Sequence, residues 1–388
     1  MVLARLFLVL VALCFAAAPL RAAQDTIGEY NRALEKNPQN AELYYSRGFQ
    51  FYLQNDYNKA MEDFVKALSL SPRHVGAVYG KGLVYQARGM NDRAIDEFTT
   101  VIGLNPRLQE AFMYRGFAYH AKGKREEALK DYTRAIELGK LTGVHYSLYY
   151  NRGTVFTQQG EYDKALADYN KALELNPKAL EIYSNRAYAY FCKREYDKAL
   201  EDYERVMKLK PQASDYFSRG NVYFEKGDVQ LAIDDYTKSM FLNPNMDAVY
   251  LARGKAYSSM GRFVDAISDF DLALRINPLE TKIADELYFN RGAAHSLLVH
   301  DDMAISDFGQ AIARNPYHAR AYYSRASIYL RRGNKKSACS DLAKAGHLFA
   351  SMNDVNGAQE ALRLLKSADA QSPHLPALTK AIAALKKK

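Results

Sequence analysis

The chain has 388 residues, of which 30 are tyrosine and none is tryptophan, and its formal net charge is +9. The positive excess lies at one end: residues 24–330 carry equal numbers of basic and acidic side chains, whereas residues 331–388 carry 11 basic and 4 acidic ones. A body without net charge argues against nucleic acid as the partner, because proteins of that class bind phosphates with a basic surface.

The first 23 residues have the pattern of a secretory signal. Arg5 precedes an apolar run over residues 6–18, and the segment ends in the small residues Ala22 and Ala23. The run is too short to cross a bilayer comfortably. We therefore expect residues 1–23 to be a signal peptide that is cleaved near Ala22 or Ala23 and exports the protein. An uncleaved N-terminal membrane anchor is the alternative.

From residue 24 onward the sequence repeats itself, and proline marks the period. The prolines that close successive units are mostly 34 residues apart. They are Pro38, Pro72, Pro106, Pro177, Pro211, Pro244, Pro278 and Pro316. Interruptions at residues 139–145 and 279–284 add three and four residues. We expect each to be a longer loop or an extra half-turn of helix; a functional bend or a partner contact is the alternative.

One unit, numbered from Tyr146 as position 1, shows why each repeat is a pair of helices. Positions 4, 8 and 11 (Tyr149, Gly153 and Phe156) share one helical face, and positions 20, 24 and 27 form an apolar stripe on a second helix. Gly160 interrupts the chain between the two. Proline then ends the second helix, because it disfavours helix at the residue before it.

These features resemble the tetratricopeptide repeat family, whose helix–turn–helix unit has this period and pattern. Alanine occupies position 20 in every full unit. Nine full units cover residues 41–350 and start near Ala41, Val75, Gln109, Tyr146, Leu180, Ala213, Asp247, Asp285 and Ala319. The resemblance implies an all-α protein, a right-handed α-solenoid forming one quasi-linear body. It is similar to bacterial exported members of the family, so we expect a periplasmic location.

Both ends of the repeat array are expected to carry caps. Residues 24–40 contain only the second helix of a unit and would cover the first full repeat. Residues 351–388 would form a basic cap and tail, with helices over residues 354–367 and 376–384. In the first of these helices, Ala358, Leu362 and Leu365 provide an apolar face for docking on the last repeat.

Two charged positions recur through the repeats. Position 7 is basic in every full unit: Arg47, Lys81, Arg115, Arg152, Arg186, Arg219, Arg253, Arg291 and Arg325. Position 23 is acidic in every full unit: Asp63, Glu97, Asp131, Asp168, Asp202, Asp235, Asp269, Asp307 and Asp341. Both positions flank an apolar stripe, so we expect the two series to form ion pairs within or between neighbouring repeats. A basic stripe that faces an anionic ligand is the alternative.

The first helix of each unit has a second face that is rich in apolar side chains. The resemblance implies that this face lines a concave peptide-binding groove. Its candidate contacts are Tyr45, Phe49, Tyr79, Met113, Phe117, Tyr150, Tyr188, Phe191, Phe217, Phe224, Phe289 and Tyr323. Position 6 adds Asn151, Asn185 and Asn290, and the resemblance implies that these amides bond to the backbone of an extended peptide.

The sequence contains no motif for catalysis. The eight histidines lack metal-ligand spacing, and neither a nucleophile motif nor a phosphate-binding glycine loop is present. We therefore expect no enzymatic activity, no cofactor and no metal. The sequence favours a scaffold that binds a peptide segment or helix of another protein. The alternative is a protein that associates with an envelope or membrane surface through its basic C-terminal cap.

Overall fold

The structure is a computed structural model that describes residues 20–139, 145–209, 211–276 and 283–385. Within these ranges it contains 21 α-helices and no strand, which confirms the all-α prediction. Most of the expected signal peptide (residues 1–19) lies outside the described residues. So do residues 140–144 and 277–282, which belong to the two interruptions, and the last three lysines.

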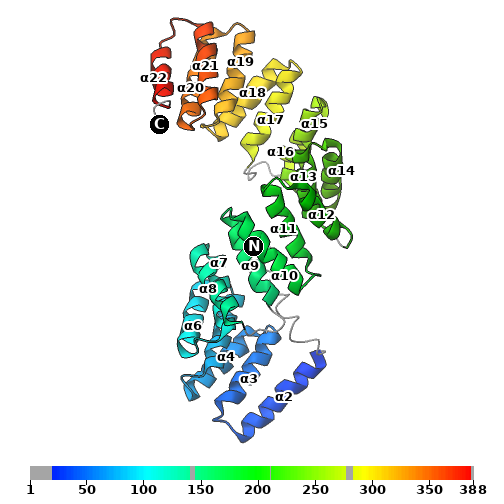
Figure 1. The fold of residues 1–388 in the computed structure, drawn as a ribbon, viewed down its shortest axis with the longest axis vertical. Helices are drawn as coiled ribbons and strands as arrows, with labels where there is room; N and C mark the ends of the chain where they lie inside the picture. The colour runs from blue at the N-terminus through cyan, green and yellow to red at the C-terminus, as the bar shows by residue number, and fades with distance from the viewer. Residues whose placement is uncertain (1–19, 140–144, 210, 277–282, 386–388) are drawn as a thin grey trace. The chain divides into compact units, whose positions relative to one another are not determined.

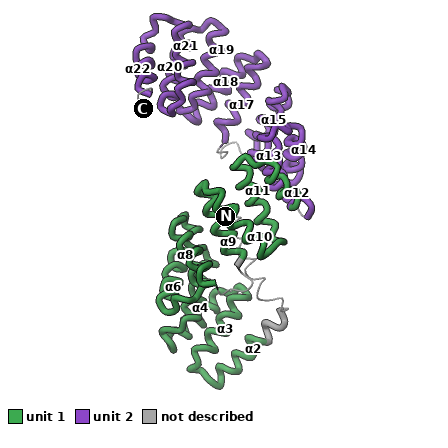
Figure 2. Tube along the Cα trace, viewed as in Figure 1, with its two compact units in different colours: residues 1–205 green, residues 206–388 purple. Residues whose placement is uncertain are grey.

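The array that the sequence predicts as one body divides into two compact units, residues 1–205 and 206–388 (Figure 2). The first unit contains α2 (Leu20–Lys36), α3 (Ala41–Leu53), α4 (Tyr57–Leu70), α5 (Val75–Ala87), α6 (Asn91–Leu104), α7 (Gln109–Ala121), α8 (Arg125–Leu138), α9 (His145–Gln158), α10 (Tyr162–Leu175), α11 (Leu180–Cys192) and most of α12 (Tyr196–Met207) (Figure 1). The second unit contains α13 (Ala213–Lys226), α14 (Val229–Leu242), α15 (Asp247–Ser259), α16 (Phe263–Ile276), α17 (Ala284–Leu297), α18 (Asp301–Arg314), α19 (Ala319–Arg331), α20 (Lys335–Ser351), α21 (Val355–Ala368) and α22 (Leu375–Leu385).

Helices α3 to α20 form nine repeats in chain order, each an odd-numbered helix A followed by an even-numbered helix B. The A helices begin within one residue of the expected unit starts. At position 8, a Cβ added to Gly153 would lie 2.9 Å from the Tyr169 ring, and one added to Gly254 would lie 2.5 Å from the Phe270 ring. These distances are shorter than van der Waals contact, so glycine is what lets helices A and B approach this closely.

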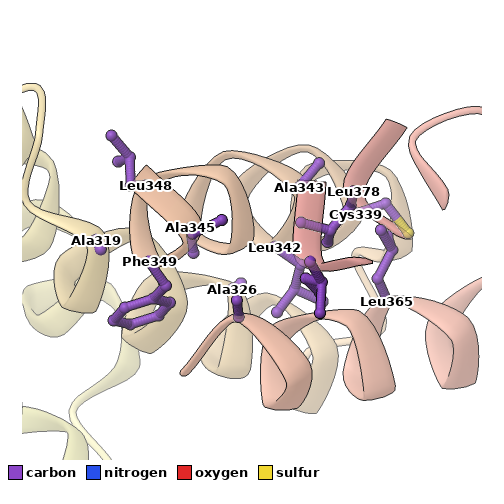
Figure 3. Packing of buried hydrophobic residues seen from close by; sticks show 13 residues of the cluster. Ala319, Ala326, Cys339, Leu342, Ala343, Ala345, Leu348, Phe349, Leu365 and Leu378 are labelled. Carbon is purple, nitrogen blue, oxygen red and sulfur yellow. The ribbon is translucent and has the colours of Figure 1, made fainter. Parts of the chain in front are cut away.

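The caps at the two ends are helical. Helix α2 packs on α3 and buries Leu34, which is 6% exposed. At the other end, α21 and α22 lie within one residue of the helices expected from the sequence. Leu365 of α21 and Leu378 of α22 join Leu342 and Phe349 of α20 in one apolar cluster (Figure 3). The last repeat therefore has its apolar face covered rather than exposed to water.

The turn between helices A and B needs one residue in the left-handed conformation. Glycine meets that need in six described repeats, with φ between 73° and 99°. Asn55, Arg194 and Val299 occupy the same position in three others, with φ of 61° or 62°. Val299 is the unusual one, because a β-branched side chain clashes with its own backbone in this conformation. Its side chain gains little in return, since the residue is 67% exposed.

Replacing Val299 with glycine should therefore stabilise the protein. We expect Val299→Gly to raise the free energy of unfolding by about 1 kcal/mol, because the relief of backbone strain exceeds the added entropy of the unfolded chain. Chemical denaturation monitored by circular dichroism would measure the change.

The matched control is Gly261→Val at the same position of the preceding repeat. Gly261 has φ of 74°, and a Cβ placed there would meet nothing within 4 Å, so only backbone strain is added. This variant should lose about 1 kcal/mol or more. Equal stability of both variants and the parent chain would show that the turn does not strain Val299.

Candidate functional site: the helix-A surface

The charged residues at positions 7 and 23 pair in all nine repeats. The shortest distances between nitrogen and carboxylate oxygen are 2.5 to 2.8 Å. Every pair joins helix A to helix B of the same repeat, which resolves the choice that the sequence left open. The pairing is confirmed, and the alternative of a basic stripe facing a ligand is wrong because these cations already have partners.

Arg152 shows the full arrangement. Its Nε and Nη2 donate to the two carboxylate oxygens of Asp168, both at 2.8 Å. Its Cζ lies 5.9 Å from the ring centres of Tyr149 and Phe156, one turn before and one turn after it on helix A. The hydrogen bond to Asp168 is the main cause that raises the arginine pKa, although burial opposes it. The cation is thus held by charge, hydrogen bonds and two aromatic faces.

The remaining guanidinium nitrogen connects consecutive repeats. Nη1 of Arg152 donates to Thr133 Oγ1 on helix B of the preceding repeat, at 3.2 Å. The same bond joins Arg47 to Asn31, Arg115 to Thr99, Arg186 to Asn170, Arg253 to Thr237 and Arg291 to Asp271. Repeat 2 has Lys81 instead of arginine, and the residue in the equivalent place before it is Val65, which offers no acceptor. Repeat 9 keeps Arg325 although the equivalent residue, Gly309, also has no side-chain acceptor.

This geometry predicts that arginine and lysine are not interchangeable at position 7. Arg152→Lys should lower the free energy of unfolding by about 1 to 2 kcal/mol, because lysine cannot bind both oxygens of Asp168 and also reach Thr133. Lys81→Arg should change stability by less than about 0.5 kcal/mol, since no third acceptor is present there. Urea denaturation would measure both changes. A loss of similar size in the two variants would contradict the proposed role of the third nitrogen.

With positions 4, 7 and 11 of each helix A directed at helix B, positions 2, 5, 6, 9 and 12 form the opposite surface. We call this the helix-A surface. In the first unit it runs over α3, α5, α7, α9 and α11, and in the second over α13, α15, α17 and α19. Consecutive A helices within each unit contact one another, so the surface continues from repeat to repeat.

Most aromatic side chains of the helix-A surface are partly packed against neighbouring side chains and partly exposed. The ring at position 5 lies against the ring at position 24 of its own repeat, with centres 5.8 to 6.2 Å apart. These pairs are Tyr45 with Phe64, Tyr79 with Phe98, Tyr150 with Tyr169, Phe217 with Tyr236 and Phe289 with Phe308. Phe49, Phe117, Phe191, Phe224 and Tyr323 are likewise half-buried. Tyr188 is the most open of the predicted contacts, with 50% of its area exposed.

Two of the predicted contacts are wrong. Met113 is 2% exposed and packs in the core beside Tyr132, and Asn151 is 4% exposed. The Asn151 amide donates to the carbonyl oxygen of Ser147, one turn earlier in its own helix. Neither side chain can reach a ligand without leaving its packed position.

The asparagine row expected at position 6 is not formed. Asn290 donates to the Glu286 carbonyl oxygen at 2.7 Å, as Asn151 does in its own helix. Asparagine commonly bonds to the carbonyl one turn earlier when it lies within a helix. Asn185 instead donates to Tyr150 Oη at 2.6 Å, across to the preceding repeat. Only this third amide therefore forms part of the helix-A surface as a link between repeats.

Tyr114, at position 6 of repeat 3, is a further residue of the helix-A surface that the sequence pattern did not predict. Its ring centre is 5.8 Å from that of Tyr79 and 5.6 Å from that of Phe117, both in edge-to-face contact. Burial is the main cause that raises the pKa of the Tyr114 hydroxyl. A large aromatic at a position that elsewhere carries small or polar residues was the signal that could have identified it.

Among the described side chains, no three His, Cys, Asp or Glu residues gather as metal ligands. In the same part of the chain, no helix has the length and apolar character needed to cross a membrane.

Sequence comparison identifies the family. Models described as tetratricopeptide repeat match residues 41–74, 109–140, 146–179, 180–212, 216–246, 248–278 and 302–346. Together these segments cover more than half of the chain. Six of them each coincide with one helix pair, and residues 302–346 run from α18 into α20. The chain belongs to the tetratricopeptide repeat family. No curated protein matches it significantly.

Solved structures of repeat proteins are similar in fold. The structure of pilF from Pseudomonas aeruginosa aligns with a TM-score of 0.50 at 19% identity, over 56% of this chain and 97% of that one. A tetratricopeptide repeat protein from Parabacteroides merdae aligns with a TM-score of 0.43 at 21% identity, over 60% of this chain and 92% of that one. A repeat protein from Cytophaga hutchinsonii gives 0.48 at 21%, over 62% and 96%. At these identities the likeness concerns the fold alone.

Proposed function

We propose that this protein is a non-enzymatic scaffold that holds a peptide segment or helix of another protein on its helix-A surface. Tetratricopeptide repeat proteins generally act as scaffolds for protein–protein interaction. The observation that carries the proposal is the series of half-buried aromatic rings along this surface, of which Tyr188 is the most open with 50% of its area exposed. Such rings supply a large contact area at a small cost in side-chain entropy.

The packing beneath these rings supports binding because it holds them in place before a ligand arrives. Tyr150, for example, is fixed by the Tyr169 ring at 6.2 Å and by the hydrogen bond from Asn185. A side chain that is already ordered loses little freedom on binding. The core contacts of these aromatics therefore favour a recognition role as well as a structural one.

Tyr188 offers the cleanest test, because its removal exposes no core. We expect Tyr188→Ala to reduce recovery of crosslinked partner by about fivefold relative to the parent protein, since a half-exposed tyrosine at an interface commonly carries more than 1 kcal/mol of binding energy. The measurement is a crosslinking pull-down from the native compartment, quantified by mass spectrometry.

The control variant is Phe241→Ala. Phe241 is 88% exposed on α14, a helix B, and lies outside the helix-A surface. It should leave partner recovery unchanged. Equal losses in the two variants would point to nonspecific adhesion of exposed aromatics, and full recovery with Tyr188→Ala would count against this part of the surface.

A second candidate is association with an anionic envelope or membrane surface through the C-terminal cap. Exposed lysines support it, namely Lys335, Lys336, Lys344, Lys366 and Lys380. Three arginines of the same region contribute less, because Arg331 and Arg332 pair with Asp301 and Asp302, and Arg363 pairs with Glu360.

Sedimentation of the protein with anionic vesicles should decrease as the salt concentration is raised, because salt screens the attraction between the lysines and the lipid headgroups. Binding that persists in high salt would contradict electrostatic attachment. Export to the periplasm remains a prediction that suits either function.

A further inference from the structure

The helix-A surface of the first unit is acidic as well as aromatic. Positions 2, 5, 6, 9 and 12 of its five A helices contain three glutamates and no lysine or arginine. The glutamates are Glu42, Glu110 and Glu181, all at position 2 and therefore on one line along the surface. Glu42 contacts His74, with 3.1 Å between Oε2 and Nε2. Among the side chains that the structure describes, no histidine, lysine or arginine pairs with either of the other two carboxylates.

Glu110 and Glu181 belong to two equivalent groups of side chains, which we call the acidic stations. The first comprises Glu110 and Tyr114 of repeat 3 with Tyr79 of repeat 2. Burial is the main cause that raises the pKa values of Tyr79 and Tyr114, and the nearby Glu110 carboxylate raises both further. Glu110 and Tyr114 lie one turn apart on α7, and the Tyr114 ring centre is 5.8 Å from that of Tyr79, so the carboxylate lies beside both phenol groups.

The second acidic station repeats this geometry two repeats further on. It comprises Glu181 and Asn185 of repeat 5 with Tyr150 of repeat 4. The pKa of Tyr150 is raised mainly by burial, and to a smaller extent by the neighbouring Tyr169 and by the Glu181 carboxylate. Asn185 takes the place that Tyr114 has in the first station and bonds directly to the Tyr150 hydroxyl. Each station therefore offers a carboxylate beside an aromatic ring from the preceding repeat.

Neither carboxylate has an ion pair with any residue that the structure describes. Both Glu110 and Glu181 are half-buried. The nine carboxylates at position 23 are at least as buried, and each of them has a basic partner within 2.8 Å. A half-buried carboxylate without a cation is a favourable place for one to bind, because water screens the charge less there.

The protein shows elsewhere what a glutamate at position 2 accepts. In repeat 8, Glu286 forms an ion pair with the ammonium of Lys255, which lies at position 9 of the preceding repeat. The residues at position 9 before Glu110 and Glu181 are Leu83 and Thr154, neither of which is a cation. The same position is therefore satisfied by an internal lysine in the second unit and left without one in the first.

We propose that the two acidic stations bind lysine or arginine side chains of a basic, extended peptide segment from a partner protein. The inference rests on the scaffold function and specifies the charge of its ligand. Each station would hold the cation between the glutamate and the tyrosine ring. Adjacent A helices lie about 10 Å apart, so stations two repeats apart are separated by about 20 Å. An extended chain covers that distance in about six residues.

The test uses the full chain and three labelled peptides of about twelve residues. One carries two lysines about six residues apart, and the others carry glutamine or glutamate in their place. Fluorescence polarisation should show the lysine peptide binding at least about tenfold more tightly than the glutamine peptide, and the glutamate peptide binding least. Added salt should weaken the lysine peptide selectively.

Matched variants assign the effect to the acidic stations. Glu110→Gln and Glu181→Gln should each weaken the lysine peptide by about fivefold while leaving the melting temperature unchanged. Glu286→Gln should leave affinity unchanged, because the Glu286 carboxylate is already paired with Lys255. Equal affinity for the lysine and glutamine peptides, or no response to Glu110→Gln and Glu181→Gln, would overturn the proposal.

Two further outcomes separate this inference from the scaffold function. If the three peptides bind with equal affinity and Tyr188→Ala abolishes that binding, the proposal of acidic stations is overturned and the scaffold function stands. Equal affinity for the lysine and glutamine peptides, together with full partner recovery in Tyr188→Ala, would overturn both the acidic stations and binding at this part of the helix-A surface. Tighter binding of the lysine peptide by a chain truncated after Leu385 would identify the protein's own three C-terminal lysines as the occupant, and would overturn assignment to a partner.

Discussion

An arginine held between two aromatic rings and a carboxylate is the contact on which this structure depends. The arginine–carboxylate pair recurs at the same place in eight of the nine repeats, and two rings flank the arginine in six of these. In the remaining repeat lysine with glutamate takes its place. A guanidinium ion suits this place because its charge persists when buried, its planar face stacks on rings and its nitrogens point in three directions. Two nitrogens join the helices of one repeat, and in six repeats the third nitrogen bonds to the helix that precedes the repeat. One side chain thus links the two helices of a repeat and, in these six, the repeat to its predecessor.

The helix-A surface is a consequence of that arrangement. Because one face of each helix A is committed to the arginine and its rings, the opposite face is presented in the same orientation in successive repeats. Aromatics at position 5 reach inward to the ring at position 24, so the surface has rigid elements rather than loose side chains. The charges differ between the units: in the first, Glu110 and Glu181 at position 2 form no ion pair with a described residue, whereas in the second Glu286 pairs with Lys255. The two units are built from the same kind of repeat but therefore present different charges on their helix-A surfaces.

The sequence predicted the fold well because its evidence is periodic. The proline spacing, the alanine at position 20 and the glycine at position 8 each follow from helix packing, and the helices begin where they imply. The ion pairs were also predictable, although only coordinates show that they lie within repeats. The site was less predictable. Asn151 and Asn290 bond to their own helix, and spacing alone cannot tell that choice from contact with a ligand. The Tyr79, Tyr114 and Glu110 group depends on how neighbouring repeats pack, which no single unit encodes.

The first arginine of the series has a consequence for the N-terminal end of the array. Arg47 has no full repeat before it, and its Nη1 donates instead to Asn31 of α2 at 2.8 Å. The N-terminal helix thus supplies to the outermost guanidinium the acceptor that a helix B supplies to other arginines of the series. Shortening the chain up to residue 30 would leave this acceptor in place. Removing Asn31 would take it away, so the cap helix is tied to the array by the same bond that links one repeat to the next.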